Sequence, residues 1–177
     1  MQRVLILGCP GSGKTTLAKQ LGAVTGLPVV HLDRMYWRAG WVEPSKEEWF
    51  TQVRAVLAEQ AWIMDGNYGG TMELRLQSAD AVVFLDLPTE VCLWRVIRRV
   101  LSSWGRDRAD MAAGCAERLD LKFLLYVATF RTSKRAAILR RLERFEGLVY
   151  QARSTRDAQA HVARIAATVG TRPALAT

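Results

Sequence analysis

Gly8-Cys9-Pro10-Gly11-Ser12-Gly13-Lys14-Thr15 is the stretch of sequence that decides the fold. It satisfies the pattern G-x-x-x-x-G-K-[ST], and it lies between an apolar run, residues 4–7, and apolar residues at helical spacing from Leu17 onward. Glycines in such a loop let backbone N–H groups turn inward, and the helix N-terminus adds its positive dipole end. The stretch therefore predicts a loop that binds the phosphates of a nucleotide.

The loop residues have individual expected roles. Lys14 neutralises charge on the β- and γ-phosphates, and the Thr15 hydroxyl supplies a ligand to Mg²⁺. The expected cofactors are therefore ATP and Mg²⁺. We expect the following residues to contact the nucleotide: Gly8, Pro10, Gly11, Ser12, Gly13, Lys14, Thr15 and Thr16.

Beyond the loop, short apolar runs alternate with stretches of helical spacing. Strands are predicted over residues 4–7, 28–32, 61–64, 81–85 and 147–151. Helices are predicted after the loop, after Ser45, from Thr89, over 117–130 and 133–145, and after Ser154. Regular alternation of this kind predicts an α/β fold, a parallel sheet with helices on both faces.

The predicted helices carry two further expectations. Ser45 with Glu48 three residues later predicts a capping box, as does Ser154 with Asp157. In the helix from Thr89 we expect the buried side to extend through residues 101 and 104. We expect one domain over residues 1–170, followed by a flexible tail at 171–177.

Composition limits the class of protein. The chain has 177 residues, of which 50% are hydrophobic and 24% charged, as in a globular domain. No apolar run approaches the roughly 18 residues that span a bilayer. The three cysteines are far apart and make no metal-ligand spacing with the two histidines, so we expect neither disulfides nor structural zinc. The expected location is the cytoplasm, without membrane partners, and the sequence leaves the oligomeric state open.

The net charge of +8 comes from one part of the chain. Residues 95–144 hold 13 Lys and Arg but 5 Asp and Glu, whereas the remainder holds 12 of each. Such a segment attracts phosphates, whether on a nucleotide, a metabolite or a nucleic acid.

Two aspartates are candidates for the carboxylate that binds Mg²⁺ directly or through water. Asp65 and Asp86 both end predicted strands. We favour Asp65, because Asp65-Gly66 opens a loop with room for a ligand. Asp86, just before Pro88, is also placed to cap the following helix.

These motifs together resemble the adenylate-kinase-like small kinases, which include nucleoside monophosphate, shikimate and gluconate kinases. The resemblance rests on the phosphate loop, Asp33, Asp65-Gly66, Leu85-Asp86-Leu87-Pro88, and Arg95 with Arg99. More closely, His31-Leu32-Asp33, Trp62 to Tyr68 and Gly114 to Arg118 resemble bacterial DNA topology modulation proteins. The resemblance implies a three-layer P-loop NTPase fold, with strand order 2-3-1-4-5 and an arginine-rich lid at about 104–135.

The same resemblance implies roles for arginines. Arg95 would lie against the adenine or its phosphates, and Arg99 on the transferring phosphoryl group. The lid arginines implied to close over that group are Arg106, Arg108, Arg131 and Arg135. With Lys14, the implied catalytic cations are Arg99, Arg131 and Arg135.

The acceptor is expected outside the carboxyl edge of the sheet. Asp33 resembles the aspartate that holds the attacking hydroxyl in shikimate and gluconate kinases, where it orients or deprotonates the nucleophile. The other residues expected to contact the acceptor are Trp37, Asn67, Tyr68 and Arg75. His31 is expected to be a core histidine.

The leading interpretation is a Mg²⁺-ATP-dependent phosphotransferase acting on a small molecule such as a nucleoside, nucleotide or hydroxylated metabolite. The alternative is a nucleotide-binding regulatory protein that contacts DNA through residues 95–144. DNA binding would weaken steeply with salt, whereas phosphoryl transfer would require a small acceptor. A third alternative, an uncoupled ATPase, would release ADP without any acceptor.

Overall fold

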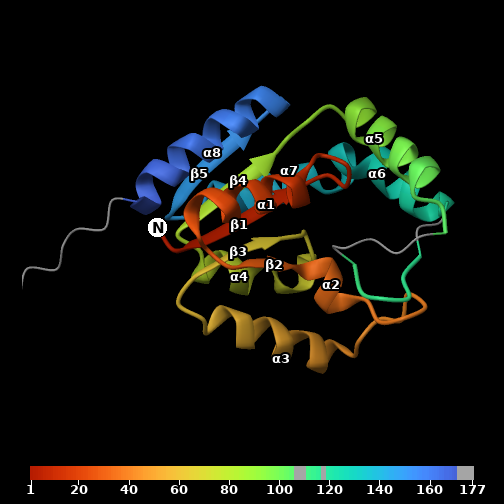
Figure 1. The fold of residues 1–177 in the computed structure, drawn as a ribbon, viewed down its shortest axis with the longest axis horizontal. Helices are drawn as coiled ribbons and strands as arrows, with labels where there is room; N and C mark the ends of the chain where they lie inside the picture. Colours follow the sequence, from red (N-terminus) through yellow and green to blue (C-terminus); the bar gives the residue numbers. More distant parts are fainter. Residues whose placement is uncertain (106–110, 117–118, 171–177) are drawn as a thin grey trace, which may run out of the picture.

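The structure is a computed structural model that describes residues 1–105, 111–116 and 119–170. One five-stranded sheet carries helices on both of its faces (Figure 1). The strands are β1 (Arg3–Gly8), β2 (Val29–His31), β3 (Trp62–Asp65), β4 (Ala81–Leu85) and β5 (Leu148–Ala152). The helices are α1 (Lys14–Thr25), α2 (Leu32–Tyr36), α3 (Lys46–Leu57), η1 (Gly69–Thr71), α4 (Met72–Ser78), α5 (Thr89–Ser102), α6 (Leu121–Ser133), α7 (Arg135–Leu142) and α8 (Thr155–Gly170).

The strand order is β2-β3-β1-β4-β5, and every neighbouring pair is parallel. This order confirms the predicted α/β fold and the topology that the resemblance implied. Val4 to Leu7 of β1 and Ala81 to Phe84 of β4 have no exposed surface. Both strands are apolar throughout because they are covered on two faces.

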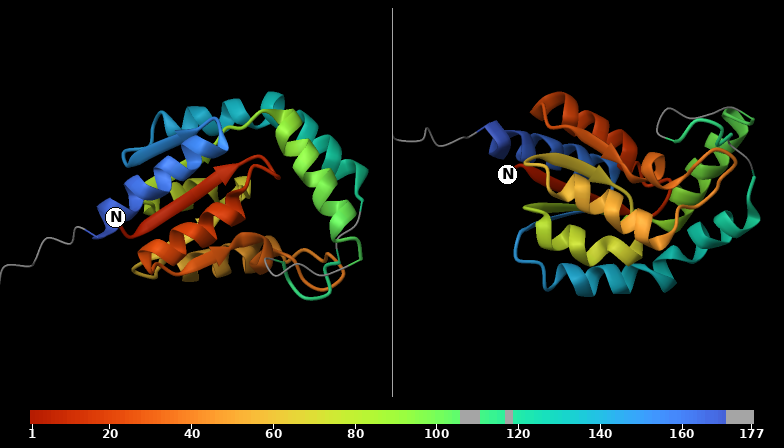
Figure 2. Two further views of the ribbon diagram at one scale, coloured as in Figure 1. Left: turned by 45° about the horizontal axis from the view of Figure 1, so that its top comes forward. Right: turned by 90° about the horizontal axis from the view of Figure 1, so that it is seen from below.

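The helices form layers around the sheet. Figure 2 shows α1 and α8 on one face of the sheet and α4 and α7 on the other. α3 runs beside the edge formed by β2 (Figures 1 and 2). α5 and α6 pack against each other beyond the carboxyl ends of the strands. The loops that follow the strands therefore face the α5–α6 pair.

Both predicted capping boxes are present. The Ser45 hydroxyl accepts a hydrogen bond from the Glu48 amide, and the Glu48 carboxylate accepts one from the Ser45 amide. Ser154 and Asp157 make the same reciprocal pair before α8. Each pair satisfies amides of the first helical turn that have no partner within the helix.

The buried side of α5 is narrower than predicted. Leu101 is 72% exposed and Trp104 60% exposed, so the prediction that the buried side extends through them is wrong. α5 buries Cys92, Val96 and Val100, a single stripe at four-residue spacing. A helix packed on one side needs no wider stripe, and residues at the ends of its apolar pattern face outward.

The predicted start of one helix near the lid also shifts. The helix expected from residue 117 is α6, which begins at Leu121 behind the Asp120 cap. Arg106 and Arg108 lie outside the described residues, as do residues 171–177, for which a tail was predicted. The predicted lid at 104–135 thus stays a prediction, and α6 is the helix described within it.

In the described part of the chain, no helix combines the length and apolar character needed to cross a membrane. Cys9, Cys92 and Cys115 are buried free thiols.

Candidate active site

The phosphate loop wraps tightly against α5. Gly11 has φ +81°, and a Cβ there would overlap the carbonyl oxygen of Cys92. The same Cβ would lie 2.9 Å from Cγ2 of Val96. Only glycine combines this backbone conformation with so close an approach. The glycine spacing in the motif is thus required by packing as well as by phosphate binding.

The N-terminus of α1 is left open by the protein. Gly13 is its N-cap with φ +98°, no side chain caps the helix, and its first turn contains no acidic residue. The first-turn amides therefore have no partner within the helix and point into the loop. Lys14 Nζ lies 3.1 Å from the carbonyl oxygen of Gly8 and 3.2 Å from that of Cys9. The first-turn amides of α1, the positive end of its helix dipole and the Lys14 ammonium therefore lie together where the sequence predicts the phosphates of a nucleotide.

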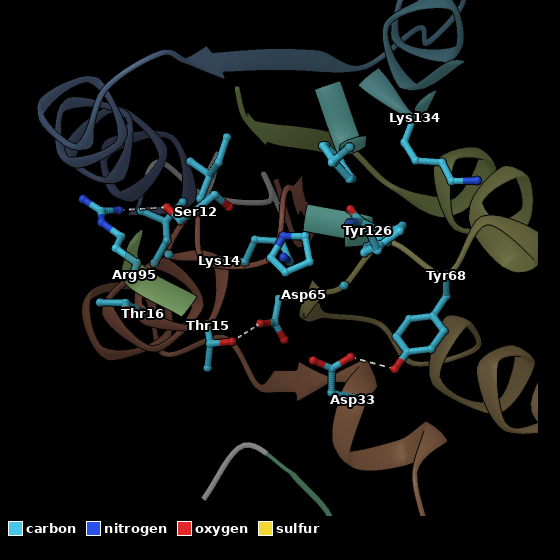
Figure 3. A pocket seen from close by; sticks show the side chains of 18 of the residues that line it. Ser12, Lys14, Thr15, Thr16, Asp33, Asp65, Tyr68, Arg95, Tyr126 and Lys134 are labelled. Carbon is cyan, nitrogen blue, oxygen red and sulfur yellow. Dashed lines mark hydrogen bonds between the residues drawn. The ribbon is translucent and has the colours of Figure 1, made fainter. Parts of the chain in front are cut away.

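Thr15 and Asp65 meet beside Lys14. The Thr15 hydroxyl donates to Asp65 Oδ2 at 2.8 Å (Figure 3). His31 Nδ1 lies 2.7 Å from Asp65 Oδ1. A hydroxyl and a carboxylate beside the phosphate loop form the oxygen donor set that Mg²⁺ prefers. Residues Thr15 and Asp65 therefore fit the predicted metal site. His31, expected to be a core histidine, instead contacts the candidate metal ligand.

Asp86 belongs to a different cluster. Its carboxylate accepts from Arg135 Nε at 2.6 Å and Arg135 Nη2 at 2.7 Å, and from the Gln151 amide at 2.8 Å. Burial pushes the pKa of Asp86 upward, but the hydrogen bonds from Arg135 and Gln151 outweigh it and leave the pKa lowered. This carboxylate is already neutralised, so the structure favours Asp65 as the candidate metal ligand.

Arg131 and Arg135 line a second cavity of about 380 Å³, together with Asp86, Pro88 and Arg153. Neither arginine lines the cleft beside the phosphate loop. The resemblance placed both on the transferring phosphoryl group, and the structure does not bring them there. Arg135 lies outside the cleft because its planar guanidinium makes a bidentate pair with the Asp86 carboxylate.

Arg75 was predicted to contact the acceptor, and this prediction is wrong. Its side chain has no exposed surface. It donates to the carbonyl oxygens of Gly66 at 2.9 Å, of Asn67, and of Tyr68 at 2.8 Å. Burial lowers the pKa of Arg75 to about 9, so the guanidinium remains charged at pH 7. Arg75 fixes the loop after β3 rather than a ligand.

Asn67 ties that loop to the phosphate loop. Its Oδ1 accepts from the Gly8 amide at 3.1 Å, and its Nδ2 donates to the Gly8 carbonyl at 2.8 Å. Both hydrogen-bonding groups of the amide are thus engaged with Gly8, although the residue still lines the cleft. The predicted acceptor contact is replaced by a reciprocal clamp at the end of β1.

Asp33 and Tyr68 form a pair on the other side of the cleft. The Tyr68 hydroxyl donates to Asp33 Oδ1 at 2.6 Å, and both residues line the cleft with Trp37 and Trp41. Burial and the neighbouring Asp33 carboxylate raise the pKa of Tyr68, so its hydroxyl is a neutral donor at pH 7. Among the described residues, no hydrogen bond reaches the second oxygen of Asp33.

The cleft has a volume of about 1380 Å³, above the usual range for a single small ligand. In the view of Figure 3, Lys14 lies between Arg95 on one side and the Asp33–Tyr68 pair on the other. Arg95 approaches the Ser12 carbonyl and donates to the Thr155 hydroxyl at 2.8 Å. The basic residues that line the cleft are Lys14, Lys19, Arg95, Arg98, Arg99, Lys134 and Arg141.

Lys134 and Arg141 are cleft residues that the sequence did not indicate. Lys134 lies at the junction of α6 and α7, and Arg141 at the end of α7 pairs with Glu73 at 3.2 Å. Their apolar neighbours in sequence predict only a helix. Which side of the helix faces the cleft depends on how α7 packs on the sheet.

No protein-family model matches the chain, and no curated protein is similar to it in sequence. Solved structures do match. A sugar kinase from Janibacter sp. HTCC2649 aligns at 17% identity over 100% of this chain and 99% of its own, with a TM-score of 0.50.

Two further structures agree. A protein described as a kinase from Chloroflexus aurantiacus shares 16% identity over 98% and 100% of the two chains, with a TM-score of 0.54. The shikimate kinase of Bacteroides thetaiotaomicron shares 15% identity over 96% and 98%, with a TM-score of 0.53. At these identities the likeness is one of fold, and it extends over essentially the whole chain.

Proposed function

We propose that this protein is a phosphotransferase of the adenylate-kinase-like type, which transfers the γ-phosphoryl group of ATP to a hydroxyl group of a small molecule. The observation that carries the proposal is the uncapped N-terminus of α1, where Lys14 and the Thr15–Asp65 pair meet. The kinases of the same fold support it. The finer likeness to DNA topology modulation proteins remains a resemblance of sequence motifs.

The donor side of the cleft binds ATP through the phosphate loop. Loop amides and Lys14 surround the phosphates, and Arg95, between Ser12 and Thr155, bounds the nucleotide side. Thr15 and Asp65 would hold Mg²⁺, which supplies positive charge against the β- and γ-phosphates when bound. Arg99, whose guanidinium lies 6.0 Å from the Phe123 ring centre, is the candidate cation for the transferring group.

Asp33 performs the acceptor side of the chemistry. Tyr68 fixes one carboxylate oxygen, so the other can accept the hydrogen bond of the attacking hydroxyl. This orients the oxygen toward the γ-phosphate and receives its proton as the new bond forms. Lys134 and Arg141 add positive charge along the same cleft.

The basic segment favours this reading over the DNA-contacting alternative. Seven of its described cations line cavities: Arg95, Arg98, Arg99, Lys134 and Arg141 line the cleft, and Arg131 and Arg135 line the second cavity with Asp86. A nucleotide in the cleft accounts for that placement. We therefore assign the charge excess to nucleotide phosphates rather than to a nucleic acid.

ADP release, measured across nucleosides, sugars, hydroxy acids and amino alcohols, tests the proposal. We expect at least one acceptor to raise turnover at least tenfold over water. Asp33→Asn should lower kcat about 100-fold or more while ATP binding is retained, because general-base and orienting groups contribute on that scale. Lys14→Ala is the control that removes donor binding. A flat response to every acceptor, together with salt-sensitive DNA binding, would refute the proposal.

A further inference from the structure

The charges of the cleft are divided between its walls. The basic lining residues come from α1, α5, α7 and the α6–α7 junction. Two acidic lining residues, Asp33 and Glu43, come from α2 and the segment that follows it. The remaining two are engaged elsewhere, since Asp65 pairs with Thr15 and Asp120 caps α6. Asp33 and Glu43 have the neutral hydroxyls of Tyr68 and Tyr36 as partners, and no cation of the described residues pairs with either carboxylate. The α2 wall, made of Asp33, Glu43 and their neighbours, is therefore negatively charged within the described part of the chain.

Three described arginines near this wall, in sequence or beneath the loop that carries Tyr68, do not line the cleft: Arg34, Arg38 and Arg75. Arg75 is fully buried beneath the loop that carries Tyr68. Arg34 and Arg38, the arginines nearest to Asp33, are not among the described lining residues, and Arg38 pairs with Glu48 at 3.0 Å. A phosphate or carboxylate held against Asp33 would thus meet like charge and no described cation of the α2 segment.

The rest of the wall is aromatic. Trp37 and Trp41 pack edge to face with ring centres 5.4 Å apart, and Tyr36 packs against Tyr68 at 4.7 Å. In the part of the chain that the structure describes, positive φ occurs outside glycine at Trp41 and Tyr68 alone, and both line the cleft. Bulky residues adopt this conformation at a cost, and such strain gathers at ligand sites.

Aromatic faces beside carboxylates are the chemistry that recognises organic cations. We infer that the phosphate acceptor is a hydroxylated amine, whose ammonium group lies among Glu43, Trp37 and Trp41 while its hydroxyl binds Asp33. This inference deepens the proposed phosphotransferase function and rests on it. Phosphorylated and carboxylated compounds are rejected by the same charges that attract the amine.

Transfer to such an acceptor exchanges one P–O bond for another. The hydroxyl oxygen forms a bond to the γ-phosphorus, and the bond from that phosphorus to the β,γ-bridging oxygen breaks. The hydroxyl proton passes to Asp33 and then to water, and ADP leaves. The ammonium group keeps its protons throughout and serves only for recognition.

The test uses compounds that share a skeleton and differ in charge. Glucosamine, glucose, gluconate and glucose 6-phosphate form one series, and 3-aminopropanol, 1,3-propanediol and 3-hydroxypropionate form a shorter one. Equilibrium binding is followed by tryptophan fluorescence, and ADP release is measured separately. We expect the amine of each series to bind at least threefold more tightly than the neutral compound, and the anions more weakly than both.

Glu43→Gln isolates the charge without changing size. It should weaken amine binding about five- to tenfold and leave the neutral compounds within twofold, because a single charge-assisted contact is lost. Glu47→Gln, at an exposed position outside the cleft, is the matched control. Anions that bind as well as amines, amines no better than neutral compounds, or an unaltered preference in Glu43→Gln would each overturn the inference. Failure of ADP release with the binding order intact would overturn the phosphotransferase proposal instead.

Discussion

Arg75 and Asn67 act on the backbone of neighbouring loops. Arg75 holds three consecutive carbonyl groups after β3, and Asn67, within that segment, clamps Gly8. Through these two residues the position of Tyr68 is coupled to the start of the phosphate loop. The donor and acceptor sides of the cleft are therefore built on one hydrogen-bonded unit.

Replacing Arg75 with Met should destabilise the protein by about 3 kcal/mol, because three buried carbonyl groups lose their donor. For a domain of this size the melting temperature should fall by about 6–12 °C, measured by circular dichroism. Gln77→Ala, exposed on the same helix, is the control and should melt like the wild type. A stable Arg75→Met protein with an altered KM for its acceptor would instead support the prediction that Arg75 contacts the acceptor.

The phosphate loop could be predicted residue by residue because its function depends on consecutive positions. The sequence also indicated that Asp33 and Asp65 lie at the cleft, because each stands where a strand ends at the carboxyl edge of the sheet. The structural role of Arg75, which holds the backbone of the loop after β3, could not be predicted, because its partners are carbonyl oxygens and every residue carries one. His31 and Lys134 were missed for a related reason: only the packing of α7 and the register of β2 on β3 bring them to the site.

At the scale of elements, Asp86 joins β4, β5 and α7. The carboxylate follows β4, Gln151 belongs to β5, and Arg135 is the first residue of α7. Asp86 is 7% exposed, so its charge depends on these partners. The cluster fixes the beginning of α7, from which Lys134 and Arg141 reach the cleft.

Arg135→Met should cost about 2 kcal/mol in the free energy of unfolding at pH 7, where Asp86 is ionised and loses its partner. The lowered pKa of Asp86 means that the pair contributes fully above the unfolded value of about 3.9 and is lost as the pH falls below it. The deficit relative to wild type should therefore shrink between pH 5 and pH 2 in urea unfolding. Arg140→Met, exposed on the same helix, should show no such trend. A deficit that is constant with pH would contradict the role assigned to this pair.

The strands were predictable because central strands of a parallel sheet read as unbroken apolar runs, and β4 agrees with its prediction residue for residue. The ends of the helices near the α5–α6 pair could not be predicted in the same way. Leu101 and Trp104 continue the apolar spacing of α5 but face outward, because burial there is set by what packs against the helix. Sequence periodicity identifies the helix without identifying its neighbour.

For the whole molecule, the sheet order places the phosphate loop and the two candidate site carboxylates at the same edge of the sheet. β1 carries the phosphate loop in the middle of the sheet, while β2 and β3 bring Asp33 and Asp65 to the same carboxyl edge. The α5–α6 pair lies across that edge (Figures 1 and 2), and α5 brings Arg95, Arg98 and Arg99 to the cleft beside the phosphate loop. A nucleotide at the phosphate loop and a second molecule at Asp33 can therefore meet above Lys14, as the proposed transfer requires.

Isothermal titration calorimetry with ATP, in Mg²⁺ and in EDTA, measures whether the phosphate loop and the Thr15–Asp65 pair bind Mg²⁺ and ATP together. Wild type should bind ATP more tightly with Mg²⁺, and Lys14→Ala should weaken binding at least tenfold. Asp65→Asn should bind ATP equally in both buffers, whereas Asp86→Asn should keep the Mg²⁺ dependence. Absence of ATP binding to wild type would contradict the assignment of the phosphate loop, and full Mg²⁺ dependence in Asp65→Asn would contradict the assignment of Asp65 to the metal.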